Sequence, residues 1–188
     1  DAAAVLKGPG MLSAEYSLPF LAHYCMEPMN CTALLDGSRL SVWAPTQAET
    51  IARDVAAAAA DVSAKNVTVR RTLIGGGFGR RAEMDFVAYA AAVARAFPGR
   101  PIKLTYSREE DIRHDMYRPA AVIRVRGALG PDQRAAALDY VIATQSATAS
   151  YYTRTPTPRG GNPRRDEGAA SGAANLIYGV PNLRVAFA

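Results

Sequence analysis

Residues 75–79, Gly-Gly-Gly-Phe-Gly, are the part of this sequence best suited to bind a ligand. Four glycines around one phenylalanine build a poor core, because glycine packs no side chain and loses much backbone entropy on folding. A β-branched run before the loop (Val67–Val69, then Leu73 and Ile74) predicts a buried strand, and residues 84–97 after it predict an apolar helix. A strand, a glycine loop and a helix in this order present backbone N–H groups to an anion or an electron-rich cofactor.

Two familiar glycine motifs do not fit this loop. A dinucleotide fingerprint needs glycines at its first, third and sixth positions, and the sixth position counted from Gly75 is Arg80. A phosphate-binding loop needs Gly-Lys-Ser or Gly-Lys-Thr, which the sequence lacks. Taken alone, the run is therefore at least as compatible with a plain glycine-rich turn between a strand and a helix.

The cysteines and histidines do not form a metal motif. Cys25 and Cys31 are too few for an iron–sulfur cluster or a structural zinc site, each of which usually needs four ligands. A disulfide between them is one option, and two buried free thiols are the favoured one. His23 and His114 have no neighbours at zinc spacing, so we expect packed or exposed histidines.

The charge balance leaves a second class of function open. The chain has 22 basic and 17 acidic residues, and its arginines are scattered with local pairs, so we expect mostly solvated faces and ion pairs. Residues 151–165 combine tyrosines with arginines, as a non-enzymatic nucleic-acid-binding or subunit-interaction module would. Asp166 and Glu167 follow at once and weaken the nucleic-acid interpretation.

The elements before the loop can be read from turn and helix signals. Asp36-Gly37 predicts a hairpin between residues 32–35 and 40–43. Thr46 and Glu49 fit a capping box, which predicts a helix over about residues 47–61 with Gln47 at its first position. The helix over 84–97 is apolar on nearly all faces, which predicts burial on several sides.

The second half predicts more strands. Residues 102–106 form a short strand, 108–111 a polar or helical turn, and 122–127 with 135–144 a hairpin. Residues 151–174 show no period, which predicts a functional loop or disorder, and 175–188 are strand-like. The fold class is therefore α+β, a mixed sheet with hairpins and two main helices, and no apolar run is long enough to span a membrane.

Five motifs in order resemble one family across residues 17–188. They are His23-Tyr24-Cys25-Met26-Glu27-Pro28, Trp43-Ala44-Pro45-Thr46-Gln47, the glycine loop with Arg80-Arg81, Arg108-Glu109-Glu110-Asp111, and His114-Asp115-Met116-Tyr117-Arg118-Pro119. Together they resemble the molybdenum-binding subunit of the xanthine dehydrogenase and aldehyde oxidase family. Within that family the sequence most resembles isoquinoline 1-oxidoreductase β-subunits and membrane-associated aldehyde dehydrogenase large subunits.

The resemblance implies roles for individual residues. Gly76, Gly77, Phe78 and Gly79 would bind the cofactor, with the backbone of Phe78 and Gly79 facing the metal's oxygen ligands and the Phe78 ring lining the substrate pocket. Arg118 would orient the substrate, the alternative being an ion pair with Glu109, Glu110 or Asp111. Glu27 would shape a loop near the pocket, and Gln47 would reach the cofactor edge or lie in solvent. Purine-oxidising members have a glutamate where this chain has Ala82, so an aldehyde or simple N-heterocycle is expected.

The resemblance also implies what accompanies the chain. The cofactor would be a molybdenum–molybdopterin in its cytosine dinucleotide form, oxidising the substrate with water as the oxygen source. Iron–sulfur clusters would lie on a small partner subunit, and the catalytic base in the C-terminal remainder of the same subunit. Residues 1–16 would be a leader or linker, and 17–188 part of the first molybdenum-cofactor-binding domain, a fragment inactive alone. A periplasmic or membrane-associated location is favoured and a cytoplasmic one left open.

Overall fold

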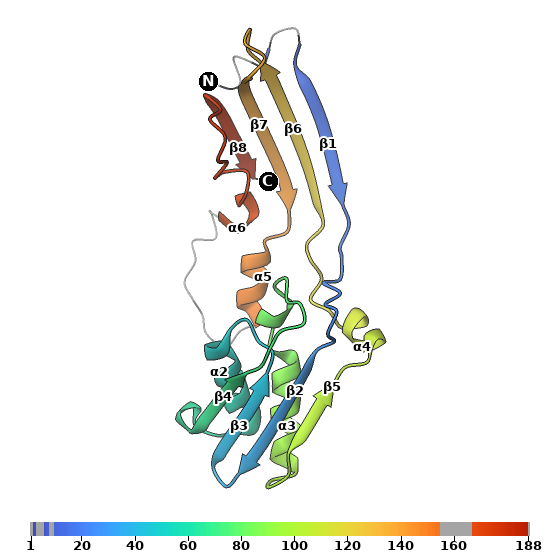
Figure 1. The fold of residues 1–188 in the computed structure, drawn as a ribbon, viewed down its shortest axis with the longest axis vertical. Coiled ribbons are helices and arrows are strands. Elements are labelled where there is room, and N and C mark those ends of the chain that lie inside the picture. The colour runs from blue at the N-terminus through green and yellow to red at the C-terminus, as the bar shows by residue number, and fades with distance from the viewer. Residues whose placement is uncertain (1, 3–5, 8–9, 155–166, 188) are drawn as a thin grey trace. The chain divides into compact units, whose positions relative to one another are not determined.

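Two four-stranded sheets organise the chain (Figure 1). A computed structural model describes residues 2, 6–7, 10–154 and 167–187. They divide into two compact units, one of Asp1–Leu21, Arg118–Ser150 and Gly160–Ala188 and the other of Ala22–Tyr117 and Tyr151–Arg159. The glycine loop belongs to the second unit.

The sheet of the second unit has the order β4-β3-β2-β5. Strands β2 (Asn30–Asp36) and β3 (Arg39–Ala44) form the expected hairpin, β5 (Ile102–Thr105) pairs antiparallel with β2, and β4 (Val67–Arg71) pairs parallel with β3. The inward residues of β2 and β3 alternate with outward ones, so the sheet buries one face.

Two helices cover that face, which confirms the two main helices expected from the sequence. Helices α2 (Glu49–Ala60) and α3 (Asp85–Ala96) pack against each other and the sheet. Their contacts consist mostly of alanines, whose small side chains allow close approach. The core also contains Met29, Leu40, Val42, Phe86 and Val87.

Three local expectations were wrong. The expected capping box is not formed: helix α2 begins at Glu49 with Ala48 as its N-cap, and Glu49 pairs with Arg71 rather than reaching back. The buried Thr46 hydroxyl accepts from the Ala48 amide and donates to the Arg81 carbonyl. Strand β4 ends at Arg71, where its partner β3 ends, and Leu73 is 94% exposed. Helix α3 is buried on one side only, with Tyr89 and Phe97 exposed.

The first unit contains the second sheet, with strand order β1-β6-β7-β8. Strands β6 (Ala121–Leu129) and β7 (Ala135–Thr144) form the other expected hairpin, and β8 (Asn182–Phe187) adds parallel to β7. Strand β1 (Leu12–Leu18) pairs with β6 along its whole length, and it begins inside the range expected as a leader or linker.

Short helices complete the described residues. They are α4 (Arg108–Arg113), α5 (Ala147–Arg154), α6 (Glu167–Ala170) and the 3₁₀ turns η1 (Ala64–Asn66) and η2 (Arg80–Ala82). Of the polar or helical turn expected at residues 108–111, the structure has the helical one, which Ser107 caps. Both described ends of the segment expected to be a loop or disordered are thus helical, whereas residues 155–166 lie outside the described residues. Among the helices described, none has the length and hydropathy required to cross a bilayer.

Candidate functional site

The glycine loop connects the end of β4 to η2 in a conformation that demands glycine. Gly76 has φ +99° and Gly79 φ +103°, a region that residues with a Cβ rarely adopt, and Phe78 between them also has a positive φ of 54°. A Cβ on Gly76 would lie 3.2 Å from the Phe78 ring, so the ring folds back over its own loop. The Phe78 side chain is nevertheless largely exposed, at 68%.

Two other glycines allow close contact with neighbouring segments. A Cβ on Gly75 would lie 2.4 Å from the Glu27 Cβ, and one on Gly77 would lie 2.6 Å from Gln47 Oε1. The Gly75 N–H donates to Glu27 Oε2 at 2.8 Å, and the Gly79 N–H donates to Gln47 Oε1 at 3.1 Å. Gln47 is exposed and contacts the loop, and its expected reach to a cofactor edge stays a prediction.

Arg81 holds the glycine loop through hydrogen bonds from its buried guanidinium. Its side chain is fully buried and donates from Nε to the Gly76 carbonyl at 2.6 Å. Its Nη2 donates to the carbonyl and to Oε2 of Glu27, at 2.6 and 2.9 Å, and Nη1 donates to the Pro45 carbonyl. Burial lowers the pKa of Arg81, and the charge of Glu27 opposes that shift. The guanidinium thus ties three chain segments together.

Arg80 anchors the other side of the loop. It forms a bidentate pair with Asp85, at 2.7 and 2.8 Å, and its Nε lies 3.1 Å from Asp115 Oδ1 without hydrogen-bond geometry. Arg80 and Arg81 are thus buried and ion-paired, so of the solvated faces and ion pairs expected for the arginines this pair has the second.

Asp115 holds His23, as expected for a packed histidine. The carboxylate accepts from the His23 backbone N–H and lies 2.9 Å from Nδ1 of its ring. Burial raises the pKa of Asp115, but the hydrogen bonds from His23 and the charge of Arg80 hold it below its ordinary value. The other ring nitrogen of His23 lies on the loop side, 3.7 Å from where a Cβ on Gly79 would be.

The loop leaves backbone donors free. Among the described residues, the amides of Gly76, Gly77 and Phe78 have no hydrogen-bond acceptor, whereas those of Gly75 and Gly79 do. Of the two groups expected to face a cofactor, the Phe78 amide is therefore available and the Gly79 amide is occupied by Gln47. Successive free N–H groups beside left-handed residues can bind anionic oxygens.

Arg118 belongs to the first unit, where its backbone pairs with Leu21. Its side chain is exposed and, within the described part of the chain, makes no ion pair. Glu110 pairs instead with His114 at 2.6 Å, and Asp111 with Arg108 at 2.9 Å. The expected alternative, an ion pair of Arg118 with these acidic residues, is therefore absent.

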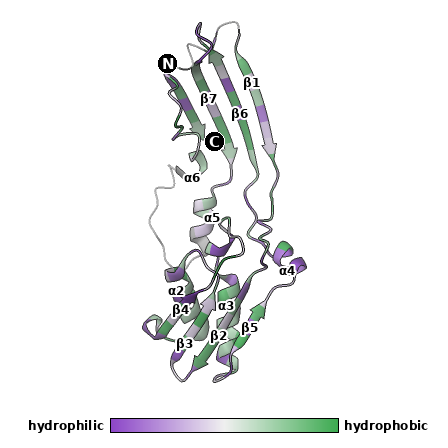
Figure 2. Ribbon diagram, viewed as in Figure 1, coloured by the Kyte–Doolittle hydropathy of each residue, from purple (hydrophilic) through white to green (hydrophobic). Residues whose placement is uncertain are grey.

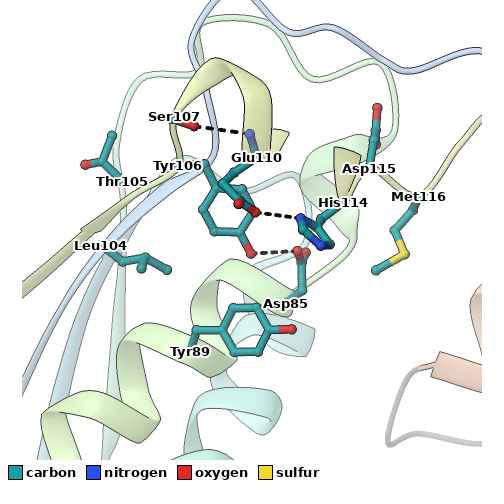
Figure 3. A pocket seen from close by; sticks show the side chains of 10 residues that line it. All are labelled: Asp85, Tyr89, Leu104, Thr105, Tyr106, Ser107, Glu110, His114, Asp115 and Met116. Atoms are coloured by element: carbon teal, nitrogen blue, oxygen red, sulfur yellow. Dashed lines mark hydrogen bonds and ion pairs between the residues drawn. The ribbon is translucent and has the colours of Figure 1, made fainter. Parts of the chain in front are cut away.

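A separate cavity of about 650 Å³ opens beside α3 and α4 (Figure 3). Several of its polar groups are already paired, since the Tyr106 hydroxyl donates to Asp85 at 3.0 Å and Glu110 pairs with His114. None of Gly76, Gly77, Phe78 and Gly79 lines it. In the residues that the structure describes, no cluster of three or more His, Cys, Asp or Glu side chains could hold a metal ion. A ligand at the loop would thus be held by backbone and amide groups.

Comparison with known proteins gives consistent matches. The model of the molybdopterin cofactor-binding domain family matches residues 1–162. The chain is 33% identical over 133 residues to a membrane-bound aldehyde dehydrogenase [pyrroloquinoline-quinone] of Gluconacetobacter polyoxogenes, covering 71% of this chain and 17% of that one. It is 35% identical to the isoquinoline 1-oxidoreductase subunit beta of Brevundimonas diminuta (68% and 16% covered), and 30% identical to the xanthine dehydrogenase molybdenum-binding subunit of Escherichia coli O157:H7 (74% and 18%).

Solved structures show the same fold. Quinoline 2-oxidoreductase of Pseudomonas putida 86 matches with a TM-score of 0.65 at 22% identity, covering 78% of this chain and 19% of that one. Aldehyde oxidoreductase of Desulfovibrio gigas matches with a TM-score of 0.64 at 16% identity, covering 77% and 16%. The chain thus spans less than a fifth of the proteins it resembles.

Proposed function

The chain belongs to the molybdopterin cofactor-binding domain family, and from that premise we propose that Gly76, Gly77, Phe78 and Gly79 line a molybdenum–molybdopterin site. The whole enzyme would be a molybdenum hydroxylase that oxidises an aldehyde or an N-heterocycle and takes its oxygen from water. This chain would supply part of the cofactor site, because it spans only 17% and 16% of its first two curated relatives.

The free amides of Gly76, Gly77 and Phe78 are the observation that carries the proposal. Anionic oxygens of a molybdenum–pterin group suit a row of backbone donors, and the positive φ values of Gly76 and Gly79 turn the backbone toward such a ligand. Buried Arg81 fixes the Gly76 carbonyl, so the donors are held in place before a ligand arrives. The residues present fit the group.

The chain's own residues would bind and orient rather than transfer protons. When bound, the group supplies the oxidising centre at which water's oxygen is transferred to the substrate carbon. The exposed Phe78 ring would exclude water from one side of the substrate, and the Arg118 guanidinium would hydrogen-bond a carbonyl or ring nitrogen. The catalytic base would lie in the C-terminal remainder of the subunit.

The substrate class follows from the position after the loop. Ala82 offers no carboxylate for the hydrogen-bonding edge of a purine, and its carbonyl accepts from the Tyr151 hydroxyl at 3.3 Å. Relatives named for aldehyde and isoquinoline oxidation are 33% and 35% identical, and one named for xanthine is 30% identical. Because these three identities differ little, the choice of an aldehyde or N-heterocycle rests on Ala82.

Electron transfer would need other polypeptides. The two cysteines of the chain, Cys25 and Cys31, are both buried, so iron–sulfur clusters would lie on a small partner subunit. We propose the cytosine dinucleotide form of the cofactor and no nucleic-acid partner. The tyrosine- and arginine-containing segment behind the rival nucleic-acid interpretation lies largely outside the described residues.

Metal content tests the proposal directly. The full polypeptide, produced in bacteria supplied with molybdate, should contain molybdenum and release a fluorescent pterin on oxidation. Gly79→Ala should lower molybdenum content by at least about fivefold. Gly99→Ala is the matched control, because Gly99 also has a positive φ (76°) but stands in open space at a distant turn. Absence of molybdenum, or equal losses in both variants, would refute the site.

A further inference from the structure

The sheet of the first unit has one face made of apolar residues on all four strands (Figure 1). Residues paired across strands point to the same face, so the register assigns each side chain. Tyr16 pairs with Ile123, Ile123 with Ile142, and Ile142 with Phe187. The same face carries Leu12, Ala14, Leu18, Ala121, Val125, Gly127, Leu138, Tyr140, Leu183 and Val185.

The opposite face carries the charges, together with Ala128 and Ala137, which pack against Ala2 and Leu6. Arg124 pairs with Glu15 at 3.2 Å, and Asp139 pairs with Arg184 at 2.7 Å and also with Arg126. Figure 2 shows hydrophilic stretches within the largely hydrophobic strands of this sheet. A sheet divided in this way normally packs its apolar face against a second layer and leaves the polar face in water.

The apolar face is exposed along its two edge strands, β1 and β8, whereas its side chains on the central strands β6 and β7 are half-buried or buried. Leu12, Tyr16 and Leu18 are 63%, 57% and 49% exposed, and Phe187 is 43% exposed, whereas Ile142 is buried. The short helix α6, which lies against β7 and β8, leaves these side chains open. From strand spacing and rise, the face measures on the order of 400 Å². The largest apolar patch on a typical monomer has a similar area, about 300–600 Å², and is often functional.

The composition of the face favours a permanent cover. It has no charged or amide side chain, and its polar atoms are confined to the hydroxyls of Tyr16, Tyr140 and Thr144 at the end of β7. Transient interfaces keep polar and charged groups, whereas obligate ones resemble a domain core cut in half. The face has the second composition.

We infer that this apolar face is the inner layer of a core whose outer layer is supplied by a further part of the same polypeptide, outside these 188 residues. The chain spans 17% and 16% of its first two relatives, so each of those polypeptides has ample length to supply a layer. A covalently attached segment also has a high effective concentration at the face. A second layer packed on this face would lie about 10 Å from the sheet and would bury Tyr16 and Leu18 between the two.

Site-specific photo-crosslinking in the full polypeptide tests this inference. Tyr16→p-benzoylphenylalanine places the probe on the apolar face, and the same probe at Ser17 is the matched control on the polar face of the same strand. After irradiation, mass spectrometry should join the Tyr16 probe to a peptide of the same polypeptide outside residues 1–188. The polypeptide should stay monomeric on a denaturing gel, and the Ser17 probe should give at least about fivefold less of that product.

Other products would overturn the inference. A band of twice the mass would show that a second copy covers the face, and an adduct to a different subunit would show a separate partner. An adduct to residues 22–117 would assign the cover to the neighbouring unit. Equal yields from both probes, or no Tyr16 adduct at all, would show that the face has no fixed cover. None of these readouts depends on molybdenum.

Discussion

Arg81 donates from one nitrogen to both the backbone carbonyl and the carboxylate of Glu27, 54 positions earlier in the chain. The Glu27 carboxylate then accepts from the Gly75 amide, and the Glu27 amide donates to the Gly75 carbonyl. One fully buried cation and one carboxylate thus hold the start of the glycine loop. The loop owes its shape to these contacts as much as to its glycines.

Removing the Glu27 carboxylate should destabilise the fold. Glu27→Ala leaves the Arg81 guanidinium buried without its charged partner, and because Glu27 is 35% exposed we expect a loss of about 2 kcal/mol in the free energy of unfolding. Glu27→Gln keeps an acceptor and should lose less. Urea unfolding measures both, with Glu49→Gln as the control, because Glu49 also pairs with an arginine, Arg71, but both side chains are exposed. An effect of Glu27→Ala no larger than the control would contradict the role of the pair.

Gly77 and Gln47 should be energetically coupled. A Cβ at Gly77 would displace Gln47 Oε1, which accepts from the Gly79 amide, so Gly77→Ala should cost about 1–3 kcal/mol of unfolding free energy. In a Gln47→Ala background the same change should cost at least about 1 kcal/mol less. A double-mutant cycle measured by denaturant unfolding gives this difference. Strictly additive effects would show that the contact with Gln47 is not what disfavours a side chain at position 77.

Stability should depend on pH through Asp115. Its folded pKa lies below the unfolded value of about 3.8, so its contribution is fully present above that value and is lost as pH falls through the folded pKa. Asp115→Asn should therefore be most destabilising at neutral pH and approach the parent protein in acid. Unfolding measured from pH 7 down to pH 3 checks this. A constant difference over that range would rule out the carboxylate's charge as the cause.

Both thiols should be unreactive in the folded protein. Burial raises the pKa of Cys31 to about 12 and also raises that of Cys25, so neither forms much thiolate at pH 8. The structure has them as free buried thiols, which confirms the favoured expectation over a disulfide. A colorimetric thiol reagent should detect almost none in the native chain and two after denaturation. Rapid native labelling would show that the core around β2 opens.

Local signals predicted the elements better than the contacts between them. The turn at Asp36-Gly37 and the bounds of α3 are encoded by neighbouring residues, and both were right to within a few positions. The Thr46 hydroxyl accepts locally from the Ala48 amide, but it also donates to a buried carbonyl 35 positions away. No local pattern reports such a partner.

The candidate site shows the same contrast between local signals and contacts of residues far apart in the sequence. The glycine run identified the loop, because glycines with no packing role mark close approach of the backbone to something else. Glu27 was expected to shape a loop near the pocket, but the partners of Arg80 and Arg81 were not identified, and His23 finds Asp115 across 92 positions. The sequence shows the acidic residues 109–111 and the motif around Arg118, but which side chains pair with one another depends on the fold.

Arg118 should affect turnover without affecting stability. Its backbone pairs with Leu21, but its side chain is exposed and unpaired within the described residues, so Arg118→Ala removes no contact that holds the fold. If the guanidinium orients the substrate, kcat/KM of the complete enzyme should fall about 10- to 100-fold, as loss of one charge-assisted hydrogen bond predicts. Arg118→Lys should rescue only part of this, because an ammonium does not reproduce bidentate geometry. Arg134→Ala, an exposed arginine in the turn after β6, is the control and should leave kcat/KM and the unfolding midpoint unchanged. Equal losses in Arg118→Ala and Arg134→Ala, or a lowered midpoint in Arg118→Ala, would instead mean a general effect of charge or fold.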